Sequence, residues 1–289
     1  MVSHKKVIDG LTKRQSAEKD SREQSRDSIR FHYVKDGQWE EKIWRRYEGK
    51  PRYTFDLTNP ILTTLRNDIQ DLEFGIKTVA TSDGDNADVI DGLLRAIQNV
   101  SNFSLVRAYT VDDLMVSGEG SWRIVTDWVE SESFDQDILL KPIVDSINRL
   151  WLGHSEEIDG SDCREGWLLT SITIDEYDND YPNGSRQSVG SEEPISDECK
   201  DIVIGEYFYL EKESKVIVKA SNNKVYDAEE FDRVKDQLAM EGITELRRRT
   251  KKVDKCYIRK FDGGGWLADA EETPFSYIPL VQGLATARS

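Results

Sequence analysis

The sequence is poor in the residues that build metal sites and disulfide frameworks. Its 289 residues include three cysteines, which are far apart and form no C-x-x-C pair, and three histidines. A disulfide framework or a zinc site is therefore not expected, and the cysteine content fits a reducing cytosol. The histidines lie in no G-x-S-x-G, Cys–His or H-E-x-x-H context, so no catalytic residue is proposed. These residues are Cys163, Cys199, Cys256, His4, His32 and His154.

Long apolar runs are missing as well. No stretch approaches the roughly 20 apolar residues that a membrane-spanning helix needs. The first residues, MVSHKKVIDGLTKRQ, contain no apolar segment of the kind found in secretory signals. The sequence therefore predicts a protein that is soluble and intracellular where it is made, without contact to a membrane.

A surplus of positive charge is also absent. There are 39 lysines and arginines against 55 aspartates and glutamates, which gives a net charge of −16. This balance argues against a protein that coats nucleic acid, because phosphate binding needs excess lysine and arginine. A wall past which DNA slides remains compatible with it, since repulsion prevents sticking. The length allows one large domain or two medium ones.

Two motifs resemble ligand-binding motifs in composition, but their residue spacing does not match. Gly118-Glu119-Gly120 precedes a strand, whereas a phosphate cradle needs a helix directly after the loop, so a helix-to-strand turn is expected. The acidic run 175–184 misses the EF-hand pattern because Pro182 occupies a ligand position. A weak cation site there stays open, with a solvated loop as the default. No cofactor, metal or enzyme activity is predicted.

The first 117 residues read as mainly helical. Residues 1–30 are charged and are expected to form a helical or partly disordered arm that orders only against a partner. Hydrophobic periodicity then organises residues 31–117. The expected elements are a short helix carrying Trp39, Ile43, Trp44 and Tyr47, a helix that Asn59 caps and Pro60 begins, a strand over Phe74–Val79, and helices over residues 87–100 and 103–116.

Residues 118–281 read as β-rich, which makes the whole chain α+β. Alternating apolar residues predict strands, and residues 176–200 carry the composition of a long mobile loop. The charged segment Glu211–Ser214 is expected to be a hairpin turn. The predicted strands cover residues 121–128, 139–143, 167–174, 202–210, 215–220 and 256–261, with a helix over 227–242.

Two groups of side chains are candidates for contacts with partners. A basic block reverses the sign of charge locally and predicts contact with DNA phosphates or an acidic partner, against the simpler interpretation of a solvated strand face. It consists of Arg247, Arg248, Arg249, Lys251, Lys252, Lys255, Arg259 and Lys260. The aromatic stripe with Trp39, Trp44 and Tyr47 is a candidate subunit contact, against ordinary core packing.

The order of these signals resembles the portal proteins of short-tailed phages of the Salmonella lederbergvirus type. The most specific match is the string Gly118-Glu119-Gly120-Ser121-Trp122-Arg123-Ile124-Val125-Thr126-Asp127. The resemblance runs from about residue 30 to 281, so residues 282–289 are expected to be a non-matching tail. The looser matches are Gln38-Trp39, Arg52-Tyr53-Thr54-Phe55-Asp56, the Pro60 helix, Trp151 with Asp162, and Tyr277-Ile278-Pro279-Leu280-Val281.

The resemblance implies a subunit of a twelve-membered ring at one capsid vertex, present in the virion and in the host cytoplasm during assembly. In the family, the terminase motor pumps double-stranded DNA through the ring, and the DNA leaves through it into the tail. The matched region would be the outer wing, which contacts neighbouring subunits and capsid protein. Such portals continue into stem, clip and crown segments, so this chain alone is not expected to conduct DNA or to dock the motor.

Two other classes of function compete with a portal subunit. A head–tail adaptor or scaffold-like module of a phage or prophage would bind protein without a role on DNA, and would be a stable monomer with one discrete patch. A nuclease or nucleotide-dependent enzyme would need carboxylates that converge on a metal ion. The spacing of the acidic residues favours no such cluster.

Overall fold

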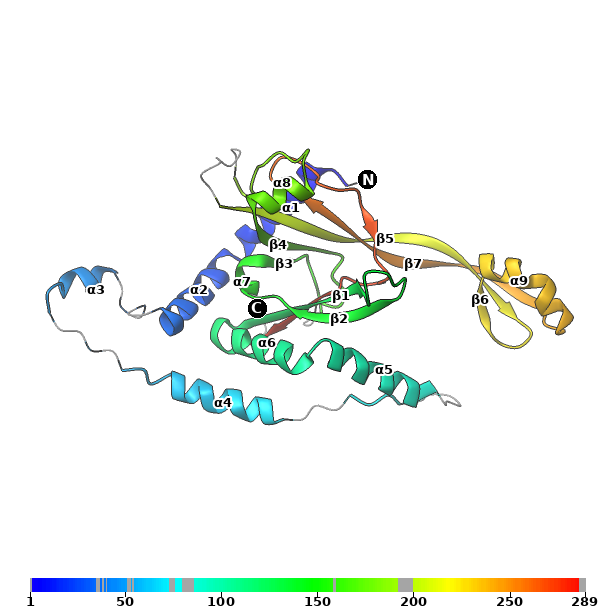
Figure 1. Cartoon of the computed structure of the whole chain (residues 1–289), viewed down its shortest axis with the longest axis horizontal. Helices are drawn as coiled ribbons and strands as arrows, with labels where there is room; N and C mark the ends of the chain where they lie inside the picture. Colours follow the sequence, from blue (N-terminus) through cyan, green and yellow to red (C-terminus); the bar gives the residue numbers. More distant parts are fainter. Residues whose placement is uncertain are drawn as a thin grey trace.

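The computed structural model describes residues 2–34, 37, 39, 41–50, 53, 55–72, 76–79, 86–157, 160–191 and 200–285. Helices dominate up to residue 117, and antiparallel strands dominate after it (Figure 1). This arrangement confirms the expected α+β class. Within the described ranges, no helix is both long and apolar enough to cross a membrane.

The charged N-terminal segment packs onto the body of its own chain. It forms helices α1 (His4–Ala17) and α2 (Lys19–Tyr33). Val7 and Leu11 on α1 are almost fully buried, because they pack in one cluster with Trp151 and a second tryptophan of the larger sheet. The expectation that this arm orders only against a partner is therefore wrong. Val7 and Leu11 are four residues apart, so they share one face of α1 and hold that helix on the larger sheet.

The helices expected between residues 31 and 117 are confirmed. A short helix carries part of the aromatic stripe, and three longer helices follow it. Asn59 is the first residue of its helix and Thr58 takes the N-cap position, so the expected cap by Asn59 is wrong. The Asp56 Oδ1 atom accepts from the backbone N–H groups of Thr58 and Asn59 at 3.1 and 2.9 Å just before the helix. The four helices are α3 (Glu41–Arg46), α4 (Asn59–Asp71), α5 (Asn86–Val100) and α6 (Phe103–Ser117).

One strand predicted in this region is not found. Residues 76–79 have no regular structure, so the strand predicted over Phe74–Val79 is wrong there, and residues 74 and 75 lie outside the described part. The alternating pattern is short, and no neighbouring strand pairs with residues 76–79 within the described ranges. A strand needs such a partner for its backbone hydrogen bonds.

The junction between α6 and the first strand confirms the expected helix-to-strand turn. Gly118 ends α6 with φ +81°, a left-handed conformation that favours glycine. Gly120 lies directly against the preceding helix, where a Cβ atom would overlap the backbone oxygen of Thr110. Both glycines therefore serve the backbone path between helix and sheet.

The smaller sheet has the order β2-β1-β9. Its strands are β1 (Glu119–Trp128), β2 (Gln136–Pro142) and β9 (Leu280–Leu284). The last strand pairs with β1 from Leu280 opposite Arg123 to Leu284 opposite Glu119. Residues 282–284, which the sequence assigned to a non-matching tail, thus complete this sheet.

The larger sheet has the order β3-β4-β5-β7-β8, and β6 pairs with the outer half of β5. The main hydrophobic core joins both sheets, since Leu280 of β9 packs in one cluster with Leu168 and Phe208 of the larger sheet. The elements are β3 (Leu150–Leu152), β4 (Glu165–Thr173), β5 (Asp201–Ala220), β6 (Val225–Asp227), β7 (Glu245–Phe261) and β8 (Glu271–Glu272), and α7 (Ser146–Arg149) precedes β3.

Strands β5 and β7 form a ribbon that extends beyond the rest of the sheet and carries helix α9 (Ala228–Met240) at its far end (Figure 1). The hairpin turn predicted at Glu211–Ser214 is wrong, because β5 runs through this segment without a break. Its charged residues meet opposite charges on β7: Glu211 faces Lys255 and Lys212 faces Asp254, and Glu213 reaches Lys255 diagonally at 2.9 Å. Charged residues in a strand pair are stable when opposite charges face each other.

The segment predicted to be a mobile loop is partly ordered. Its first residues belong to helix α8 (Ile174–Asp180), and the stretch that follows is held by the buried carboxylate of Asp262. The prediction of a loop from residue 176 is therefore wrong for α8. Residues 192–199 lie outside the described part of the chain.

Candidate functional site

The predicted basic block is divided between two environments. Its first five cations lie on the outer half of β7, where residues 245–252 are all exposed. The remaining three lie where β7 enters the body of the molecule, and each has an intramolecular contact. The structure therefore brings only part of the block together on one free surface.

Lys255, Arg259 and Lys260 each contact neighbours within the body. The Lys255 Nζ atom lies 2.8 Å from Glu272 and 2.9 Å from Glu213, and hydrogen bonds to these carboxylates raise the pKa of Lys255. The Arg259 guanidinium lies 4.2 Å above the ring of Trp266, and the Lys260 Nζ atom lies 5.9 Å from the ring centre of Tyr181. These three cations stabilise the fold around β7.

Arg248 points to the side of the ribbon that α9 covers. It is paired with Asp232 of α9 and with Glu245, and these hydrogen bonds raise the pKa of Arg248. The residue opposite it on β5 is Val218, which is fully buried against Phe231 of α9. Lys252, four residues further along β7, shares this side of the strand and is exposed.

The opposite side of the ribbon concentrates positive charge. Alternate residues of a strand point to the same side, so Arg247, Arg249 and Lys251 lie together on the side away from α9. Facing residues of an antiparallel pair share a side as well, and those opposite these three are Lys219, Ile217 and Lys215 of β5. The basic face is defined here as Lys215, Lys219, Arg247, Arg249 and Lys251.

Little negative charge balances the basic face. Within the described residues, the one ion pair of its members joins Lys215 to Asp227 at 2.5 Å. Arg247, Arg249 and Lys251 form no ion pair with any described acid. The sequence pattern identified these three, but it missed Lys215 and Lys219, because the predicted turn at Glu211–Ser214 separated two segments that form one strand.

The aromatic stripe lies on and beside α3. The rings of Trp39 and Tyr47 are 6.3 Å apart, and the Tyr47 ring also lies 5.7 Å from the Lys50 Nζ atom. Tyr47 is 42% exposed. Several aromatic side chains before and after it in the sequence are more exposed. The side chain of Trp44 lies outside the described part. The neighbouring exposed aromatic residues are Phe31, Tyr33, Tyr53 and Phe55.

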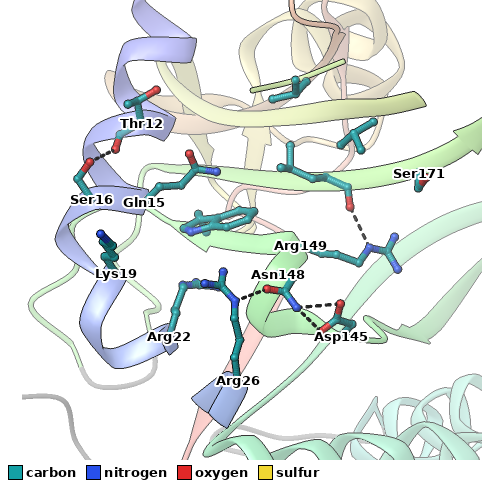
Figure 2. Close-up of a pocket in the computed structure, with 14 residues that line it drawn as sticks. Thr12, Gln15, Ser16, Lys19, Arg22, Arg26, Asp145, Asn148, Arg149 and Ser171 are labelled. Atoms are coloured by element: carbon teal, nitrogen blue, oxygen red, sulfur yellow. Dashed lines mark hydrogen bonds between the residues drawn. The ribbon is translucent and has the colours of Figure 1, made fainter. Parts of the chain in front are cut away.

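A cavity of about 750 Å³ between the N-terminal helices and the larger sheet was not predicted (Figure 2). Three arginines line it, and each already has hydrogen-bond acceptors: Arg26 donates to Asn148 at 2.7 Å, and Arg149 donates to the Leu169 oxygen at 2.9 Å. Burial lowers the pKa of Arg149. Arg22 donates to the backbone oxygen of Leu150 at 2.6 Å. The hydrogen bonds of Arg22 and Arg26 therefore hold helix α2 against the edge of the larger sheet and the segment before it.

One signal in the sequence marks the wall of this cavity. Gln15, Lys19, Arg22 and Arg26 recur at steps of three and four residues, which places them on one face of a helix. From the sequence, residues 1–30 are expected to form a helical or partly disordered arm that orders only against a partner, whereas these side chains line a cavity of their own chain.

The described residues offer no cluster of metal-binding side chains. They contain no group of three or more histidine, cysteine, aspartate or glutamate side chains that could hold a metal ion. The start of the acidic run lies in α8, where Arg186 donates to Asp178 at 2.8 Å and lowers the pKa of that carboxyl group. Cys163 and Cys256 are buried and free, and burial raises the pKa of both thiols.

Comparison with known proteins places these features in a family. The model of the family described as Phage P22-like portal protein matches residues 9–288, which extends beyond residues 30–281 at both ends. The "Portal protein" of Acyrthosiphon pisum secondary endosymbiont phage 1 is 26% identical over 303 aligned residues. That alignment covers 96% of this chain and 42% of the relative, so the chain spans less than half the length of this relative. Because the family model matches nearly all of the sequence, the chain belongs to the phage P22-like portal protein family.

Proposed function

We propose that the chain is a structural subunit of a phage portal ring, built into one vertex of the capsid. The observation that carries this proposal is the family match over residues 9–288. The α+β architecture and the projecting ribbon suit a peripheral, wing-like part of such a ring, with a helical region at 31–117 and a β-rich region from 118. Its partners are then other copies of the subunit and capsid protein, and its location is the virion.

Exposed apolar side chains support a role in assembly. A monomeric protein rarely leaves a large apolar surface in water, yet Phe55 is 81% exposed and Tyr53 75% exposed. We propose that the aromatic stripe, with Trp39, Trp44 and Tyr47, contacts a neighbouring subunit. Burial of one large apolar side chain at such a contact contributes about 1.5–3 kcal/mol.

The proposal also covers the passage of DNA through the ring. Passage of double-stranded DNA and engagement of a terminase motor are functions of the whole ring, to which this chain contributes a peripheral part and no catalysis. Its net charge of −16 suits a wall that does not hold DNA. The basic block then meets either DNA phosphates or an acidic protein surface.

Quantitative mass spectrometry of purified phage particles tests the proposed function. A portal subunit is expected at about one copy for every few tens of capsid proteins, because a closed ring occupies a single vertex. Antibodies against the ribbon should label particles at one vertex. Absence of the protein from particles, or a copy number equal to that of the capsid protein, would refute the proposal.

A further inference from the structure

The basic face of the β5–β7 ribbon is a strand surface on which positive charge predominates, with Asp227 of β6, opposite Ile217, as the acid that pairs with Lys215. Helix α9 covers the other side of the ribbon, and among the described residues the cations of the basic face are exposed. Residues two apart on a strand are separated by about 6.6–6.8 Å. Arg247, Arg249 and Lys251 therefore form a regular row, with Lys219 and Lys215 opposite its two ends.

Apolar groups lie within this charged surface. Ile217 is half-buried between Lys215 and Lys219, and Val225 of β6, which pairs with Lys219, is 60% exposed. A surface with regularly spaced cations and exposed aliphatic groups can bind a protein segment that carries both acidic and apolar side chains.

The turn between β1 and β2 has the complementary composition. Residues 124–140 contain five acids and no lysine or arginine. Phe134 in the turn is 96% exposed, Trp128 is 54% exposed and Val129 is 49% exposed. The acidic loop is defined here as residues 127–137, with Asp127, Glu130, Glu132, Asp135 and Asp137.

Hydrogen bonds within the acidic loop give it a defined shape. The backbone N–H of Val129 donates to the oxygen of Asp135 at 3.1 Å, and that of Ser133 donates to the oxygen of Glu130 at 3.0 Å. The Ser133 hydroxyl accepts from the backbone N–H of Asp135 at 3.0 Å. The exposed phenyl ring of Phe134 is thus presented on an ordered turn, which lowers the entropic cost of binding.

We infer that the basic face of one copy of this chain docks against the acidic loop of a second copy. No ion pair joins the two surfaces within one molecule across the described residues. At their edges Lys215 pairs with Asp227 and Asp127 pairs with Lys141 at 3.6 Å. The other charged side chains of the basic face and the acidic loop form no ion pair with a described residue. Two different patches that meet make a head-to-tail interface, and repetition of such an interface with a closing rotation makes a ring. This inference rests on the proposed portal function and assigns residues to its subunit contact.

Protein fits these surfaces better than DNA. A DNA backbone would satisfy the cations, but it offers no apolar partner for Val225 and no role for Phe134. The overall charge of −16 repels DNA, whereas it makes another copy of the chain an acidic partner. The charges on the two surfaces also steer association and fix its orientation.

A charge exchange between two variants of the full 289-residue chain tests this inference. The first variant reverses the basic face with Arg247→Glu, Arg249→Glu and Lys251→Glu. The second reverses the acidic loop with Glu130→Lys, Glu132→Lys and Asp135→Lys. A matched control reverses three exposed lysines of α1, Lys5→Glu, Lys6→Glu and Lys13→Glu. Circular dichroism and thermal melting verify that each variant folds.

Sedimentation velocity at low salt provides the readout. The wild type and the control are expected to self-associate, and each interface variant alone to do so about tenfold more weakly or worse. An equimolar mixture of the two variants is expected to recover association, because every face then meets a loop of opposite charge. A misfolded variant would not recover on mixing, so recovery separates the interface from general damage.

Three results would overturn the inference. They are a wild type that stays monomeric up to about 1 mM, interface variants that associate like the control, and variants that lose association without recovery on mixing.

Fluorescence anisotropy with a short DNA duplex supplies the last comparison. DNA binding that is lost in the basic-face variant and kept in the control, with self-association unchanged, would assign the face to DNA. The copy number in particles tests the portal proposal independently.

Discussion

The hydroxyl of Tyr177 donates a 2.6 Å hydrogen bond to the Oδ2 atom of Asp262, although the two residues are 85 positions apart in the sequence. Asp262 is 1% exposed. Its carboxylate also accepts hydrogen bonds from the backbone N–H and the hydroxyl of Ser185. The backbone N–H groups of Gly264 and Gly265 donate to it as well. One carboxylate thereby ties α8, the segment after it and the turn after β7 into a single unit.

Replacement of this carboxylate by an amide is expected to destabilise the protein. In Asp262→Asn, the side chain loses its charge and one of its two acceptor atoms, so buried donors lose their partner. We expect the free energy of unfolding at pH 7 to fall by about 3 kcal/mol, measured by denaturant titration. Asp269→Asn, at an exposed aspartate nearby, is the control and should change stability little.

The effect of this substitution should depend on pH. Burial opposes ionisation of Asp262, but the hydrogen bonds from Tyr177, Ser185 and Gly265 outweigh it and lower the pKa. A lowered pKa adds stability above the unfolded value of about 3.9, and that stability is lost as the pH falls through the folded value. The difference between wild type and variant should therefore shrink below about pH 4. A constant difference from pH 3 to 8 would contradict this account.

The sequence predicted the helices better than the contacts between distant segments. Helical periodicity located α5 and α6, and glycine placement located the turn at Gly118, because these signals are local. The long ribbon was missed since Glu211–Ser214 has the composition of a turn, and only its pairing with β7 explains why it is a strand. The cation row on β7 was visible in sequence, whereas Lys215 and Lys219 join it only through strand register.

The buried arginine of α2 supports a second prediction. Arg22 is 2% exposed, donates to the backbone oxygens of Ile147 and Leu150, and lies 4.7 Å above the Trp151 ring. In Arg22→Met the apolar stem is kept, but two buried carbonyl groups lose their donor. We expect a loss of about 3 kcal/mol in the free energy of unfolding.

Arg26 provides the matched control for Arg22. It lies one helical turn further along α2, and its hydrogen bond to Asn148 is exposed. Arg26→Met should therefore cost less than about 1 kcal/mol. Hydrogen exchange adds a readout that a general loss of stability does not give, because Arg22→Met should increase exchange in α1 and α2 more than in β5. Equal costs for the two variants would exclude the proposed role of Arg22.

A third prediction concerns Asp113 on α6. Burial, together with the nearby charge of Asp145, raises the pKa of Asp113 to about 6. The folded protein then binds more protons than the unfolded chain between about pH 4 and 6, so this group lowers stability as the pH rises through that window. Asp113→Asn removes the cost of the buried charge. We expect it to stabilise the protein by about 1 kcal/mol at pH 8, after allowing for partial exposure.

The gain from Asp113→Asn should vanish below about pH 4, where the wild-type carboxyl group is protonated as well. Thermal melting across pH 3.5 to 8 measures it, with Asp68→Asn on the exposed side of α4 as the control. Destabilisation by Asp113→Asn at pH 8 would mean that the charge of Asp113 makes a favourable interaction in the folded protein.

Gly120 at the start of β1 and Gly92 inside α5 should respond in opposite directions to alanine. A Cβ atom at position 120 would overlap the backbone oxygen of Thr110 in α6, whereas one at position 92 on α5 would have no described atom within 4 Å outside the backbone of its own helix. Gly120→Ala must push the first strand away from the helix, and we expect a loss of about 2–3 kcal/mol. Gly92→Ala removes freedom from the unfolded chain and favours the helix, so a gain of about 0.5–1 kcal/mol is expected. Denaturant titration of both variants measures the pair, and a loss of stability in Gly92→Ala would show that this face of α5 packs against more than the described contacts.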